Sequence, residues 1–154
     1  MKKLAIFMFS VFIITCQISK DLLPEAINGL VRNKKLQGTE AEQYVNRLHM
    51  QNVVANKSEI GFYETSENTA IIYITHYNQA DTATNELNRM IKKIQTEKTP
   101  FVQGENISIN EINVFRCFGL GQTHYVFSRD NILFWVSADT LMAEEFIEEY
   151  LERI

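Results

Sequence analysis

Apolar residues recur along this chain with two spacings, next to one another in short runs and at every third or fourth position. The first spacing, rich in β-branched and aromatic side chains, is typical of strands. It predicts strands over residues 59–64, 69–77, 112–118, 123–129 and 132–137, with a further short strand over 106–110. Polar turns separate these segments. The pair Asp130-Asn131 tolerates positive φ, so the last two strands are expected to form a hairpin.

The second spacing predicts three helices. The first spans about residues 40–49, where Thr39 and Glu42 form a capping-box pattern. The second follows Asp81, which can cap it, and ends before Pro100. The third begins near residue 139 or 140 and carries an apolar face opposite a row of glutamates. This order indicates the α+β class. We expect a single domain over residues 39–154, with helices packed on a mostly antiparallel sheet of about five to six strands.

The start of the chain has a different pattern. Lys2 and Lys3 precede an apolar run over residues 4–14. A run of that length suits the core of a signal peptide, whereas a membrane-spanning helix needs about 20 apolar residues. We therefore predict that residues 1–15 are a signal peptide and that the protein is exported.

The sequence Ile13-Ile14-Thr15-Cys16 resembles the lipobox of bacterial lipoproteins, with Thr15 where that pattern usually has Gly, Ala or Ser. The resemblance implies acylation of Cys16 and attachment to the membrane through lipid, outside the cytoplasm and in the cell envelope. An ordinary secretory signal peptide is the alternative. Residues 16–38 then form a tether or an N-terminal segment of uncertain structure, in which 24–31 is a helical turn or 29–31 a strand.

Composition narrows the classes of function. The 154 residues are 45% hydrophobic, which is enough for the core of one domain. The formal net charge is −4, and nucleic-acid binding requires a clustered basic surface, so we predict no nucleic-acid partner. Three histidines and two cysteines are scattered rather than paired, and we predict no metal and no cofactor. If Cys16 carries lipid, Cys117 has no disulfide partner within the chain.

The stretch CFGLGQTHY, residues 117–125, is the main candidate for chemistry. A phosphate-binding loop would lead into a helix, but a strand follows here, so Gly119 and Gly121 are interpreted as a hairpin turn. Cys117 is then expected to face His124 across the two strands, with Trp135 on the same face. These three side chains are a candidate ligand pocket, and Cys117 with His124 is a candidate nucleophile pair. The alternative is that all three belong to the core.

The sequence contains no converging catalytic set, and the apolar stripes are accounted for by a core. We therefore predict a non-catalytic, lipid-anchored binding or interaction module whose partner is an envelope protein or a small apolar ligand. The rival hypothesis is a small thiol-dependent enzyme, or a ligand-pocket protein, that uses Cys117 and His124.

Overall fold

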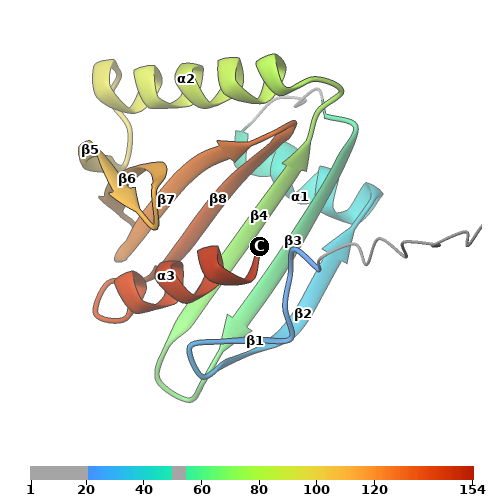
Figure 1. The fold of residues 1–154 in the computed structure, drawn as a ribbon, viewed down its shortest axis with the longest axis vertical. Helices are drawn as coiled ribbons and strands as arrows, with labels where there is room; N and C mark the ends of the chain where they lie inside the picture. Colours follow the sequence, from blue (N-terminus) through green and yellow to red (C-terminus); the bar gives the residue numbers. More distant parts are fainter. Residues whose placement is uncertain (1–20, 50–54) are drawn as a thin grey trace, which may run out of the picture.

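The computed structural model describes residues 21–49 and 55–154. The predicted signal peptide and Cys16 lie outside these residues. The described chain forms three helices and eight strands (Figure 1). In chain order they are β1 (Ala26–Ile27), β2 (Leu30–Gln37), α1 (Thr39–His49), β3 (Lys57–Glu64), β4 (Thr69–His76), α2 (Ala80–Thr96), β5 (Phe101–Ile109), β6 (Ile112–Gly119), β7 (Gln122–Arg129), β8 (Ile132–Asp139) and α3 (Ala143–Arg153).

The strands form one antiparallel sheet in the order β1-β2-β3-β4-β8-β7-β6-β5. The α+β class with an antiparallel sheet is confirmed, but the predicted number of five to six strands is too low. The two further strands are β1 and β2. They form in the N-terminal segment, for which the sequence allowed a tether, a helical turn or a strand.

A β-bulge explains why β2 was not evident from the sequence. Its pairing with β3 shifts between Arg32 and Lys34. The shift interrupts the alternation of inward and outward side chains, since one extra residue reverses the face that every later residue occupies. Leu30 and Leu36 are six positions apart, yet they are buried on opposite faces of the sheet.

The segment before β1 also belongs to the domain. Leu23 and Ile27 are buried in the largest cluster of the core. The Tyr63 hydroxyl donates to the Pro24 carbonyl oxygen at 3.0 Å, and the Tyr150 hydroxyl donates to the Leu22 carbonyl oxygen at 2.9 Å. From residue 22 onward the chain is therefore fixed to the sheet and to α3. The interpretation of this part of the segment as a tether is wrong.

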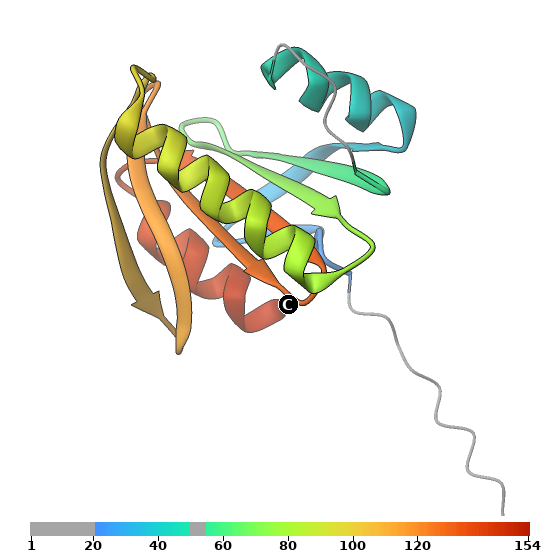
Figure 2. The ribbon, with the colours of Figure 1, turned by 90° about the horizontal axis from the view of Figure 1, so that it is seen from above.

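Helices cover both faces of the sheet (Figures 1 and 2). On the face that we name the α3 face, α3 buries Phe146, Ile147 and Tyr150 against a large apolar cluster that includes Phe127 and Phe134. The other face, which we name the groove face, carries α1 and α2 over two smaller and separate clusters. The groove face is therefore covered by two helices that do not share one core.

Two helix starts differ from the expectation. The N-cap of α2 is Gln79, whose side chain makes no capping hydrogen bond, and Asp81 lies inside the first turn. The helix α3 begins at Ala143 because β8 continues to Asp139. The Asp139 carboxylate accepts a hydrogen bond from the Thr69 backbone N–H at 2.7 Å, which ties the end of β8 to β4.

Candidate functional site

A groove of about 590 Å³ opens on the groove face, with residues from both α1 and α2 in its walls. Its floor consists of alternate residues of three neighbouring strands: Ile71, Tyr73 and Thr75 of β4, Leu133, Trp135 and Ser137 of β8, and Gln122 and His124 of β7. Its walls are Val45 of α1 and Glu86, Arg89, Met90, Lys93 and Ile94 of α2. The lining is completed by Tyr77, Thr99, Pro100, Phe101 and Leu120. The volume lies within the usual range for small-molecule sites, about 300–1,000 Å³.

The floor is continuous because the strands are paired in register. Tyr73 faces Trp135 across β4 and β8, and Ser137 lies between Ile71 and His124 in the next row. In an antiparallel sheet such directly opposed residues point to the same side. The pairing therefore gathers side chains from β4, β7 and β8, far apart in sequence, onto one surface.

His124 is held in one orientation at the floor of the groove. Trp135 Nε1 donates to His124 Nδ1 at 3.1 Å, and His124 Nε2 lies 2.9 Å from the Gly119 carbonyl oxygen. Both contacts are hydrogen bonds when the imidazole is neutral and carries its proton on Nε2. Burial lowers the pKa of His124, while the bond to Gly119 acts in the opposite direction. With both ring nitrogens engaged, His124 is an orienting group for Trp135 rather than a free base.

An aromatic wall stands beside His124. The ring centroid of Phe101 lies 4.9 Å from that of His124 and 5.2 Å from that of Trp135. The His124 and Trp135 rings are 5.7 Å apart in an edge-on arrangement. These separations are typical of favourable aromatic pairs. The groove therefore presents a packed, mostly apolar surface in which a polar network fixes the indole.

Cys117 lies opposite His124 across β6 and β7, in the register that the sequence predicts. The thiol is fully buried, and burial raises its pKa to about 11. At neutral pH it is therefore a thiol and not the thiolate that acts as a nucleophile. His124 and Trp135 line the groove, whereas Cys117 is not among the lining residues. The three candidate residues thus share one face, and two of them are accessible from the groove.

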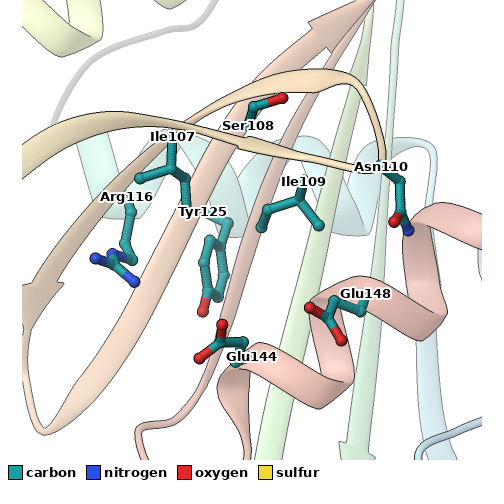
Figure 3. Close-up of a pocket in the computed structure, with 8 residues that line it drawn as sticks. All are labelled: Ile107, Ser108, Ile109, Asn110, Arg116, Tyr125, Glu144 and Glu148. Atoms are coloured by element: carbon teal, nitrogen blue, oxygen red, sulfur yellow. The ribbon is translucent and has the colours of Figure 1, made fainter.

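A second, smaller cleft of about 310 Å³ lies on the α3 face (Figure 3). Figure 3 shows Arg116 and Tyr125 on the strands above Glu144 and Glu148 of α3. Arg116 forms an ion pair with Glu105, and its buried Nε has no hydrogen-bond partner. The glutamates in this cleft are exposed, so it offers solvated charges rather than an enclosed site. We regard the groove as the stronger candidate.

Sequence reasoning did not identify most of the groove. Tyr73 was expected to lie in a central strand, and the apolar stripe of α2 was expected to lie in the core. Alternation along β4 could have indicated that Ile71, Tyr73 and Thr75 share a face. The adjacency of β4 and β8 has no local signal, because α2 and three strands separate them in sequence.

In the described part of the chain, no group of three or more His, Cys, Asp or Glu side chains is placed to hold a metal ion. The helices described there are too short or too polar to span a membrane. Comparison with known proteins gave no match to a protein-family model, a curated protein or a solved structure.

Proposed function

We propose that this protein is a non-catalytic binding protein that holds a small ligand, with an apolar body and one anionic group, in the groove between α1 and α2. The observation that carries the proposal is the groove itself. It is concave, of ligand size, and floored by aromatic and aliphatic side chains with a few polar groups among them. A protein partner would favour a flatter and larger apolar surface.

The apolar floor accounts for the body of the ligand. Tyr73, Trp135 and Phe101 are each only partly buried. A ligand that covers them removes apolar surface from water, which contributes roughly 25 cal/mol for each Å² covered. The thiol-dependent enzyme is less consistent with the groove, because the pKa of Cys117 is raised and its sulfur is covered.

The charges of the α2 wall account for the anionic group. Among the residues that the structure describes, the charged ones that line the groove are Glu86, Arg89 and Lys93. Glu86 and Arg89 form an ion pair and largely neutralise each other. Lys93 is exposed and forms no salt bridge with any residue that the structure describes, which leaves one positive charge at the groove of an acidic protein. A local charge opposite to the net charge favours a ligand of complementary sign.

Two fluorescent probes that share the same N-phenylnaphthylamine structure test the proposal. N-phenyl-1-naphthylamine is neutral, and 8-anilinonaphthalene-1-sulfonate adds a sulfonate. We expect both to bind, the sulfonate more tightly, with energy transfer from Trp135, which is the single tryptophan of the chain. If neither probe quenches Trp135 emission in the folded protein, the groove is not a binding site and the proposal is wrong.

Two neighbouring lysines supply a matched pair of variants. Lys93→Met is expected to weaken binding of the sulfonate probe about 3- to 10-fold, the effect of one partly exposed charge contact of about 0.7–1.4 kcal/mol. It should leave binding of the neutral probe unchanged. Lys92→Met removes the same charge from an exposed position outside the groove lining and is expected to have little effect. Equal losses in the two variants would show that Lys93 makes no local contact.

We also propose that the protein is exported and anchored through lipid on Cys16, on the basis of the N-terminal sequence. The mass of the protein isolated from its own cells tests this. We expect a chain that begins at Cys16 and carries acyl groups. A mass that includes residues 1–15 without acyl groups would contradict both export and lipidation. It would leave the proposal for the groove untouched.

A further inference from the structure

Four hairpins in the described chain have two-residue turns, and the first turn residue has a positive φ in each. These residues are Asn28 (φ 45°), Asn110 (φ 48°), Leu120 (φ 54°) and Asp130 (φ 52°). Asn and Asp adopt this conformation more readily than other residues with side chains, because their short polar groups form local hydrogen bonds. Leu gains nothing of that kind, so Leu120 is the exception among the four.

Packing does not compensate for this strain. Leu120 is 76% exposed and is among the few large apolar side chains that the fold leaves in water. A leucine at this turn is therefore unfavourable both for its backbone conformation and for its side chain. Asn or Asp would meet the requirements of the fold better, and the equivalent positions of the other three turns are Asn28, Asn110 and Asp130.

The turn is nevertheless held firmly in place at the groove. A Cβ on Gly119 would lie 2.6 Å from the Pro100 carbonyl oxygen, so this strand end touches the start of β5 directly. The Gly119 carbonyl oxygen is also within hydrogen-bond distance of His124 Nε2. Leu120 follows immediately and lines the groove together with Phe101. The backbone that carries Leu120 is therefore held in place beside the groove.

We propose that Leu120 is a ligand-contact residue, whose side chain covers the apolar body of the bound ligand and excludes water from the groove. The assignment rests on the proposed function. It explains why an apolar residue stands where turn chemistry and solvent exposure both favour a polar one. Residues that serve binding at the expense of stability are common at functional sites.

Leu120→Asn separates this role from a structural one. The variant relieves the strain, so we expect its melting temperature to rise by about 2–4 °C. We expect its affinity for N-phenyl-1-naphthylamine to fall about 3- to 10-fold, because part of the apolar cover is lost. A residue with a purely structural role would not produce a gain in stability together with a loss of affinity.

Asn110→Leu is the matched control. It places leucine at the same position of the β5–β6 turn, also exposed and at positive φ, away from the groove. We expect its melting temperature to fall by a similar amount and its affinity for the probe to stay unchanged. If Leu120→Asn binds the probe as the unmodified protein does, or loses affinity together with stability, the assignment is wrong. If the unmodified protein itself does not bind the probe, the proposed function fails first and this assignment fails with it.

Discussion

Phe146→Ala is expected to lower the free energy of unfolding by about 3–5 kcal/mol, the usual cost of removing a fully buried phenyl ring. Phe146 has no exposed surface, and its ring packs edge-on against Tyr63 with 5.9 Å between centroids. The loss is large because, of the three helices in the described residues, α3 alone lies on this face, so neither of the other two can move in to fill the cavity. Since the free energy of unfolding of small domains is about 5–15 kcal/mol, the variant would retain only part of its stability.

Urea denaturation followed by circular dichroism measures this loss. Glu152→Ala is the control, because Glu152 is exposed on the same helix and alanine favours helix formation. We expect its stability to stay within about 0.5 kcal/mol of the unmodified protein. A loss below about 1 kcal/mol in Phe146→Ala would show that α3 contributes little to the core.

The elements that the sequence predicted are those whose apolar pattern is uninterrupted. Runs of β-branched and aromatic residues in β4, β6, β7 and β8 located each strand to within about two residues, and the apolar stripe of α2 located that helix. Hairpin neighbours are also local in sequence. The pairing of Cys117 with His124 follows from the turn between them, and this is why that register was predicted correctly.

Bulges account for much of what the sequence did not show. In β5 the pairing with β6 shifts between Val102 and Glu105, and Gln103 has a positive φ. Before the shift Phe101 faces the groove, and after it Ile107 packs on the α3 face. The two apolar residues therefore never appeared as one alternating run, and only the end of β5 was predicted.

The groove could not be predicted for a different reason. It depends on where α1 and α2 lie over the sheet and on how far apart they stand, and both are properties of non-local packing. The sequence showed that Ala83, Leu87 and Met90 form an apolar stripe, and the structure packs them on β7 and β8. The sequence could not show that the apolar faces of α1 and α2 pack on two separate clusters and leave the sheet between them uncovered.

Glu59 is the group for which we expect the strongest dependence of stability on pH. Its carboxylate, almost fully buried on the sheet, accepts hydrogen bonds from Lys57 Nζ at 2.8 Å and Gln37 Nε2 at 2.6 Å, and lies 3.1 Å from His76 Nε2. Lys35 Nζ is 3.7 Å away. Burial alone would raise the pKa of Glu59, but these partners outweigh it and lower the pKa to about 2.

Because the pKa of Glu59 is lower in the folded protein than the value near 4.5 expected for the unfolded chain, its contribution is fully present above pH 4.5. It is lost as the pH falls from 4.5 toward 2, since the unfolded chain then binds a proton that the folded protein resists. The shift corresponds to about 3 kcal/mol.

Glu59→Gln removes the titrating group, so its free energy of unfolding should be lower than that of the unmodified protein at pH 6. The difference in free energy of unfolding between the two proteins should shrink by about 3 kcal/mol as the pH approaches 2. Parallel curves in urea denaturation across this range would show that Glu59 is not stabilised by its basic neighbours.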